Sequence, residues 1–319
     1  MRTWHVGKFK VTEVRELLIE VGLLDGLIPQ ATPEAVRDIG WMYPDYVNET
    51  GQILADIHSY VIDTGDHRIL VDAGCGNGKS YPMQPIWGGL DTQFLDRLQE
   101  AGYGRDDIDI VLCTHMHLDH VGWCSMQDED GHWVPTFPGA RVVLVRDEYE
   151  RHLSQIISTD DDAATEEGNG EVDLIARAFL PDTVALSNQT KLIQEETFQP
   201  VIEAGLLELV PTNGEIVDGV RYQSTPGHTE AHHSVRLESD GQAAFITGDF
   251  FHHPLQIAHP EWTSQGDWDG EVLAKNRRAF LESCAGTDLL VMGTHFVGIG
   301  AGYIVADGEG FRLTDIKPE

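Results

Sequence analysis

The sequence has no long apolar run, which excludes one class of protein at the outset. No stretch of the 319 residues approaches the roughly 18 consecutive apolar residues that a membrane-spanning helix needs. Residues 1–10 alternate polar and apolar side chains and lack the apolar core of a secretory signal. We therefore expect a cytoplasmic protein that has no membrane partner.

Cysteines are few and widely spaced. The chain has four of them, Cys75, Cys113, Cys124 and Cys284, and no two form a C-x-x-C pair. Without that pairing and without an export signal, neither a zinc ribbon nor a disulfide framework is expected. We interpret the four as reduced, buried thiols.

Basic residues are also scarce. Lys and Arg total 21 against 53 Asp and Glu, which gives a formal net charge of −32. A field of this sign repels nucleic acid and anionic membrane surfaces. The composition therefore argues against both as partners.

The sequence does contain two series of strands, each accompanied by helical segments. The first series comprises residues 8–16, 59–63, 68–72, 108–113 and 141–145, and the second comprises residues 206–210, 220–224, 234–238, 243–247, 289–292, 302–306 and 310–314. Helices are predicted at residues 91–101, from about residue 147, and at residues 271–284. This order indicates an α+β protein in which two sheets pack face to face with helices outside. We expect residues 1–319 to form one domain.

An irregular segment at about residues 22–55 interrupts the first series. Its apolar residues are Leu23, Leu24, Leu27, Ile28, Trp41, Met42 and Tyr43. It either covers the active site or contacts a second subunit, or it packs on its own core. A second irregular segment, the acidic run at residues 160–168, indicates a mobile surface loop.

Potential metal ligands cluster directly after the strand predicted at residues 108–113. The segment reads Thr114-His115-Met116-His117-Leu118-Asp119-His120-Val121-Gly122. Imidazoles and carboxylates suit zinc and other first-row ions. In extended backbone, His115 and His117 project to the same side, whereas Asp119 and His120 can face a second ion. Two ions about 3.5–4 Å apart can share one hydroxide, which is a strong nucleophile at neutral pH.

Three later positions can complete the ligand set. They are His228 in Thr225-Pro226-Gly227-His228-Thr229, Asp249 in Ile246-Thr247-Gly248-Asp249, and His295 in Gly293-Thr294-His295-Phe296. Each follows a predicted strand, so all three side chains should emerge at strand ends as His115 does. The carboxylate of Asp249 could bridge both ions.

These ordered motifs resemble the metallo-β-lactamase fold superfamily. The segment Leu70-Val71-Asp72-Ala73-Gly74 is similar to the Asp-x-Gly hairpin of the same family. The resemblance covers roughly residues 8–315 and implies a four-layer αββα sandwich with the metals in a cleft at one edge of the sheets. It also implies a ligand set: His115, His117 and His228 for one ion, Asp119, His120 and His295 for the other, Asp249 between them, and Asp72 steadying the metal loop.

Within the superfamily, the chain is most similar to the lactonases and the methyl-parathion-hydrolase-like phosphotriesterases. RNA-processing members usually add a nucleic-acid module, glyoxalases add a C-terminal helical domain, and the β-lactamases are usually exported. Acyl-homoserine lactonases place a tyrosine three residues after the bridging aspartate, and this chain has His252 there. We interpret His252 either as a group that polarises substrate or donates a proton, or as a structural histidine.

The resemblance implies a hydrolase with two divalent ions, zinc being the expected metal, with manganese, iron or cobalt also compatible. The predicted reaction is cleavage of a lactone or carboxylic ester by a metal-bridging hydroxide, with Asp119 and His252 as catalytic residues. The alternatives are a phosphotriesterase or aryl-esterase of the same fold, and a non-catalytic metal-binding or redox protein. The resemblance also favours a homodimer.

The roles expected of the other histidines follow from their positions relative to the ligand motifs. His232, His233 and His253 lie outside the ligand motifs, so we expect structural roles for them. Surface or loop positions are expected for His5, His58, His67, His132, His152 and His259. Trp123, which closely follows the metal loop, could line the substrate cleft or fill the core.

Overall fold

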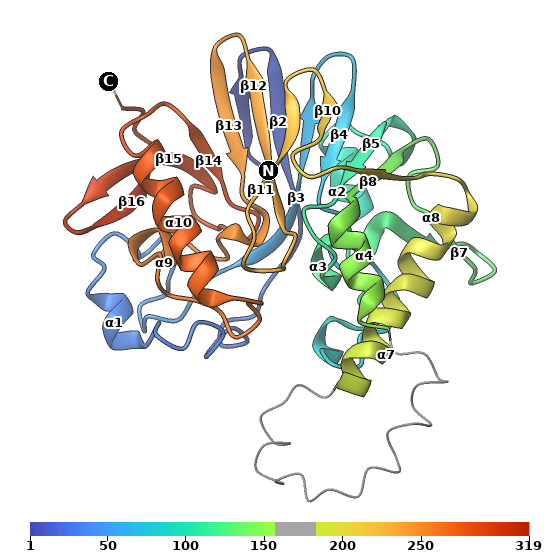
Figure 1. Ribbon diagram of the computed structural model, residues 1–319, viewed down its shortest axis with the longest axis horizontal. Helices are drawn as coiled ribbons and strands as arrows, with labels where there is room; N and C mark the ends of the chain where they lie inside the picture. Colours follow the sequence, from blue (N-terminus) through green and yellow to red (C-terminus); the bar gives the residue numbers. More distant parts are fainter. Residues whose placement is uncertain (157–182, 319) are drawn as a thin grey trace, which may run out of the picture.

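Two seven-stranded sheets form the centre of the structure, a computed structural model that describes residues 1–156 and 183–318 (Figure 1). In spatial order, the first sheet consists of β1 (Thr3–Val6), β2 (Phe9–Leu18), β3 (Asp56–Asp63), β4 (Arg68–Val71), β5 (Ile110–Leu112), β8 (Arg141–Val145) and β9 (Leu207–Val210). The second consists of β10 (Glu215–Val217), β11 (Val220–Ser224), β12 (His233–Ser239), β13 (Gln242–Ile246), β14 (Leu290–Met292), β15 (Ala301–Asp307) and β16 (Gly310–Thr314). The predicted division into two sheets is confirmed.

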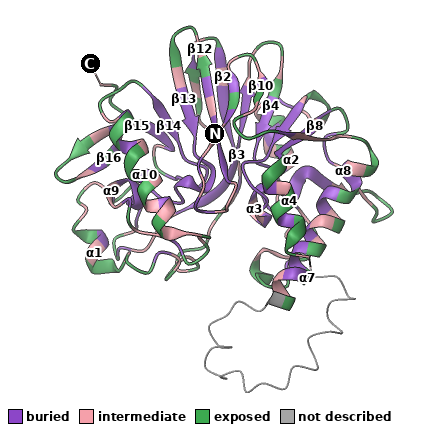
Figure 2. Ribbon diagram, viewed as in Figure 1, coloured by how far each residue is buried: buried purple, intermediate pink, exposed green. Residues whose placement is uncertain are grey.

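Three apolar layers hold the sheets and helices together, and side-chain alternation explains them. On β5, Ile110 and Leu112 point between the sheets, whereas Val111 points to the outer face of the first sheet. That outer face carries α2 (Phe94–Glu100) and α8 (Gln199–Glu203). The long helix α10 (Gly270–Cys284) covers the outer face of the second sheet. The buried residues in Figure 2 follow this layering, which confirms the α+β sandwich.

The carboxyl ends of several strands meet at one edge of the molecule. Strand β5 runs parallel to β4 on one side and to β8 on the other, and β13 runs parallel to β14 in the second sheet. Parallel neighbours end at the same edge, so the loops that follow them lie together. This edge carries the predicted ligands.

Some elements were not predicted. Strand β1 precedes the first predicted strand and pairs with β2. A small sheet of β6 (Ser125–Gln127) and β7 (Trp133–Pro135) lies apart from the two main sheets. Helix α7 (Thr183–Ile193) and a π-helical turn at Gln194–Phe198 lead into α8. The acidic run at residues 160–168 lies outside the described residues.

The irregular segment at residues 22–55 contributes to the core. Its one regular helix is α1 (Pro33–Arg37). Val36, Met42 and Val47 are buried in the cluster beneath α10. Leu24 and Leu27 instead lie on the wall of the large cavity described below.

Several side chains with a predicted environment can be compared directly with the structure. The cysteines are buried and free of disulfides, as expected. The surface prediction for His58 is wrong, because its ring is buried on β3 and its Nδ1 lies 2.6 Å from Asp56 Oδ1. The prediction is also wrong for His152, which is buried on α4 (Arg146–Ser154) against Phe198. No helix in the described part of the chain is long and apolar enough to cross a bilayer.

Candidate metal centre

All seven predicted ligands lie together at the shared strand edge. Residues 115–120 follow β5 and enter the short helix α3 (Leu118–Val121). His228 lies in the loop after β11, Asp249 in the 3-10 turn after β13, and His295 in the loop after β14. Side chains from both sheets therefore converge, although up to 180 residues separate them along the chain.

The first group contains three histidines and one oxygen of Asp249. His228 Nε2 lies 2.8 Å from His117 Nδ1 and 3.2 Å from His115 Nε2. Asp249 Oδ2 lies 3.2 Å from His228 Nε2 and 3.8 Å from His115 Nε2. All four donor atoms lie within 4.8 Å of one another. Such spacing leaves room for one ion between them.

The second group meets the other oxygen of Asp249. Asp249 Oδ1 lies 3.0 Å from His295 Nε2 and 3.2 Å from His120 Nε2. Asp119 Oδ2 lies 3.6 Å from both of these nitrogens. One carboxylate oxygen thus faces each group, which is the arrangement a bridging ligand requires.

The hydrogen bonds of the histidine Nδ1 atoms are those expected of metal-binding rings. In four of the five histidines, Nδ1 lies within hydrogen-bonding distance of an oxygen, so Nε2 is left to face the cluster. The pairs are His115 with Thr114 Oγ1 (3.0 Å), His120 with Asp72 Oδ2 (2.9 Å), His228 with Asp267 Oδ1 (2.9 Å) and His295 with the Asp56 carbonyl (2.9 Å). Two buried atoms inside the cluster, His120 Nε2 and Asp249 Oδ1, have no hydrogen-bond partner among the described residues. Buried polar atoms normally have partners, so these residues fit two bound cations.

Burial keeps one group of rings neutral. It lowers the pKa of His115 well below its ordinary value and that of His117 to about 3. Burial lowers the pKa of His228 as well, although Asp249 opposes the shift. Neutral imidazole is the form that binds a metal, so this group needs no deprotonation at neutral pH.

The other group holds protons in the absence of ions. Burial disfavours charged His120 and His295, but nearby carboxylates, Asp249 first, outweigh it. The pKa of His120 is raised well above its ordinary value, and that of His295 is raised to about 9. Burial likewise opposes ionisation of Asp249, yet the surrounding histidines hold its pKa well below the usual range. A bound cation would replace these protons.

Metal affinity should therefore increase with pH. Between the ordinary histidine value of 6.5 and the raised value of about 9, an ion must displace the proton of His295. Each released proton changes the apparent Kd by about tenfold per pH unit, so affinity should increase through this window and level off near its upper end. Chelator-competition titrations at several pH values measure the slope. A Kd that is constant from pH 6.5 to 9 would contradict the assignment.

Asp72 and His232 form hydrogen bonds to the segments that carry the candidate ligands. Asp72 Oδ1 accepts from Thr114 N at 2.8 Å, and its Oδ2 also accepts from Thr114 Oγ1 at 3.0 Å. His232 Nε2 accepts from Asp249 N at 3.0 Å. Gly248, at φ +52°, leaves space for this contact, because a Cβ there would lie 2.7 Å from His232 Nε2. His232 is thus structural, but it directly positions a predicted ligand.

His233 and His253 make other structural contacts. His233 Nδ1 lies 2.6 Å from the Ala231 carbonyl. His253 Nε2 lies 3.0 Å from the Tyr46 carbonyl, and its Nδ1 accepts from Leu255 N at 3.1 Å. Both rings are therefore hydrogen-bonded to the backbone, as expected of structural histidines.

A cavity of about 810 Å³ opens above the two groups. Its floor includes His117, Asp119, Asp249 and His252. Its apolar wall is formed by Ile19, Leu24, Leu27, Met83, Trp87, Met116, Leu118, Leu186, Ile193 and Trp268. Among the described residues that line it, Arg151 is the one Lys or Arg, and it is ion-paired with Glu230.

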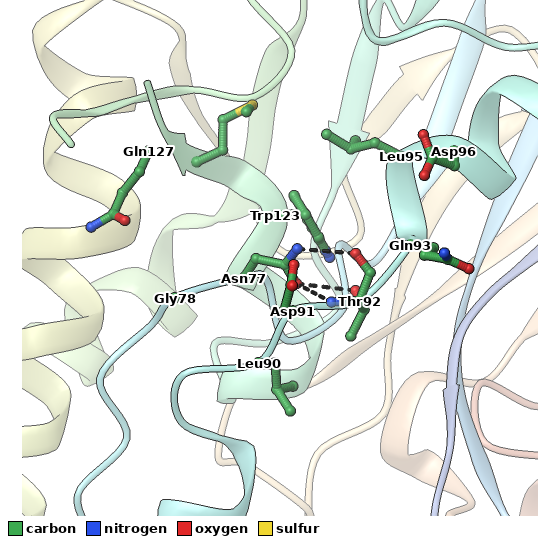
Figure 3. Close-up of a pocket in the computed structure, with 11 residues that line it drawn as sticks. Asn77, Gly78, Leu90, Asp91, Thr92, Gln93, Leu95, Asp96, Trp123 and Gln127 are labelled. Atoms are coloured by element: carbon green, nitrogen blue, oxygen red, sulfur yellow. Dashed lines mark hydrogen bonds between the residues drawn. The ribbon is translucent and has the colours of Figure 1, made fainter. Parts of the chain in front are cut away.

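Trp123 lies elsewhere. Its ring is buried, stacks on Phe94 with centroids 5.5 Å apart, and donates from Nε1 to Glu16 Oε1 at 2.7 Å. It borders a separate pocket of about 400 Å³ (Figure 3). Polar groups that line that pocket are hydrogen-bonded to one another, since Thr92 N donates to Asn77 Oδ1 at 2.7 Å. Of the two roles proposed for Trp123, the structure supports core packing.

Sequence reasoning missed three supporting residues. Asp267 holds His228, and the carbonyl of Asp56 holds His295. Glu148, on α4, contacts the loops on either side of the first group. None of the three lies in a ligand motif, and Asp267 follows His228 by 39 residues, so the ligand motifs alone do not identify them.

Comparison with known proteins agrees with this architecture. Residues 54–125 match the metallo-beta-lactamase superfamily. The sequence similarity to that superfamily thus lies in residues 54–125, and the two-sheet sandwich has the metallo-beta-lactamase fold.

Particular relatives can also be named. The N-acyl homoserine lactonase AiiB of Agrobacterium fabrum (strain C58 / ATCC 33970) is 32% identical over 76 residues, which are 21% of this chain and 28% of that protein. AidC, a dizinc quorum-quenching lactonase solved with the product N-hexnoyl-L-homoserine, superposes with a TM-score of 0.71 at 22% identity, covering 100% of this chain and 97% of AidC. The hydrolase AbOPH of the beta-lactamase superfamily superposes with a TM-score of 0.73 at 21% identity, covering 99% and 97%.

These likenesses establish the fold and leave the activity to be argued from the site. Both structural relatives are less than 25% identical to the chain. The matches to curated proteins span only 10–28% of the lengths of those proteins.

Proposed function

We propose that this protein is a dinuclear-metal hydrolase that cleaves a lactone or carboxylic ester. The ligands are those expected from the sequence: His115, His117 and His228 on one side, Asp119, His120 and His295 on the other, and Asp249 between them. The observation that carries the proposal is the division of the Asp249 carboxylate, with one oxygen facing each group of nitrogens.

Two divalent ions, zinc being the expected metal, would supply Lewis acidity and lower the pKa of water. The remaining chemistry depends on residues that line the cavity. Asp119 is partly exposed there, so its carboxylate can carry a proton to the leaving oxygen. His252 Nε2 lies 3.3 Å from Asp249 Oδ2, at the cavity floor.

The hydrogen bonding of His252 favours one tautomer. Its Nδ1 is buried without a partner among the described residues, and a buried N–H without an acceptor is costly. The proton of the neutral ring therefore belongs on Nε2, beside the cavity. From there the N–H can donate a hydrogen bond to an oxygen of the substrate and polarise it.

The cavity wall indicates which part of a substrate it can hold. Leu24 and Leu27 from the irregular segment line the cavity together with Trp87 and Ile193. Apolar groups gain about 25 cal/mol per Å² when they leave water, so an apolar acyl or alkyl group stabilises the complex. We propose that the segment at residues 22–55 covers the active site in this way.

A substrate panel tests the proposal. The purified protein, with its metal content measured, is assayed on a γ-lactone, a nitrophenyl ester and an organophosphate. We expect turnover of the lactone or the ester that a chelator abolishes and added zinc or manganese restores. Faster turnover of the organophosphate would instead favour the phosphotriesterase alternative. That alternative is supported by His252, which stands where acyl-homoserine lactonases have a tyrosine. No turnover of any member by protein with two bound ions would contradict the hydrolase proposal.

Replacing His252 by phenylalanine should separate catalysis from metal binding. Loss of one hydrogen-bond donor to a developing oxyanion typically costs about 10²–10³-fold in rate, so kcat should decrease by about that factor while the metal content is unchanged. The buried His253→Phe variant is unsuitable as a control because it would disturb the core, so the exposed His132→Phe serves instead. An unchanged kcat would assign His252 a structural role.

A further inference from the structure

Helix α4 connects two of the loops that carry candidate ligands. Its third residue, Glu148, is only 5% exposed. Glu148 Oε1 accepts from Met116 N at 3.2 Å, and Oε2 accepts from Thr229 Oγ1 at 2.8 Å. The backbone of Ala231 also donates to this carboxylate. One buried side chain thus receives three hydrogen bonds from two separate loops.

The two loops are those that hold the first group of ligands. Met116 lies between His115 and His117, and Thr229 follows His228 directly. In contrast, no hydrogen bond joins Glu148 to the residues of the second group among the described residues. Asp119 and His120 of the second group follow on the first of these loops, but they lie in helix α3, where Asp72 holds His120. A displacement of Glu148 should therefore change the spacing within the first group more than within the second.

Glu148 is placed to act as a fixed acceptor. It lies in the first turn of α4, where the helix N-terminus favours negative charge. Burial raises the pKa of Glu148 to about 7, although the hydrogen bonds from Thr229 and Met116 oppose this shift. Because donors engage both oxygens, the carboxylate borders the cavity without being free to bind a substrate.

We propose that Glu148 is a positioning residue that sets the metal affinity of one subsite, formed by His115, His117 and His228, and not of the other. The inference rests on the proposed function. Glu148→Gln removes the charge of this side chain, and hydrogen bonds to a charged acceptor are about twice as strong as neutral ones, so both loops should be held less tightly. Residues that orient ligands typically contribute 10–100-fold in affinity.

The test measures the binding of cobalt, the metal alone, to the full chain after chelator treatment. Visible absorption and calorimetry should resolve two binding steps in the wild type. In Glu148→Gln, one step should weaken 10–100-fold and the other should change less than twofold. In the His117→Ala background, which lacks a ligand of the affected subsite, Glu148→Gln should have no further effect on the remaining step.

Two further variants keep the test decisive. Glu150→Gln makes the same change at an exposed position of the same helix, so both steps should stay as in the wild type. Thr229→Val removes one hydrogen bond from Glu148 and retains the carboxylate, so it carries the test if Glu148→Gln fails to fold. It should weaken the same step by a smaller factor.

The outcomes distinguish the two proposals. If the wild type binds two ions but the variants weaken neither step, or weaken both equally, the role of Glu148 is refuted and the proposed function stands. If the wild type binds fewer than two ions, the proposed function itself fails, and this inference fails with it.

Discussion

Replacing Asp249 with asparagine should release both ions and remove nearly all hydrolysis. The carboxylate lies within 3.3 Å of Nε2 of four histidines, and its two oxygens serve different groups. An asparagine side chain has the same shape but no charge, and its nitrogen cannot bind a cation. Since residues that only orient ligands contribute 10–100-fold, loss of the shared ligand should exceed 100-fold in affinity at both subsites.

Metal content after dialysis, measured by mass spectrometry beside kcat/KM on the best substrate of the panel, checks this prediction. Asp240→Asn is the matched control, because its carboxylate is exposed and, within the described part of the chain, is ion-paired with Lys8 alone. The control should keep both ions. If Asp249→Asn retained two ions per chain, Asp249 would not be the shared ligand.

His117→Ala should lose one ion and nearly all turnover while it remains folded. The His117 ring lines the floor of the cavity, where its Nδ1 contacts His228 Nε2. Its removal therefore leaves no large void in the core, in contrast to truncation of a buried ligand such as His120. The remaining ion should stay with Asp119, His120 and His295, because none of these depends on His117.

Circular dichroism and metal quantification of the same preparation check this second prediction. The exposed His132→Ala is the control and should match the wild type in metal content and rate. Full metal content together with retained turnover in His117→Ala would refute its assignment as a ligand.

The strands and the candidate ligands could be predicted because both leave a local pattern in the sequence. The continuous apolar run before His115 predicts a strand buried on both faces, and β5 indeed contributes alternately to two apolar layers. Ligands that follow strands must emerge at a sheet edge, so the convergence of His228, Asp249 and His295 could be expected from their positions along the chain.

The supporting contacts could not be predicted, because they join segments that are distant in sequence. Glu148 and Thr229 are 81 residues apart, and Glu16 and Trp123 are 107 residues apart. Such pairs depend on the three-dimensional packing and produce no periodic signal. Strands of three residues, such as β6 and β7, are similarly too short to show alternation. The homodimer and the cytoplasmic location stay predictions.

The central claim is that seven side chains hold two cations side by side. A crystal of the purified protein, with diffraction data collected above and below the absorption edge of zinc, tests it most directly. Two anomalous peaks should appear, one among His115, His117 and His228 and the other among Asp119, His120 and His295, with Asp249 touching both. After a zinc soak, a map without any peak at these residues, or with the seven side chains dispersed, would contradict the account.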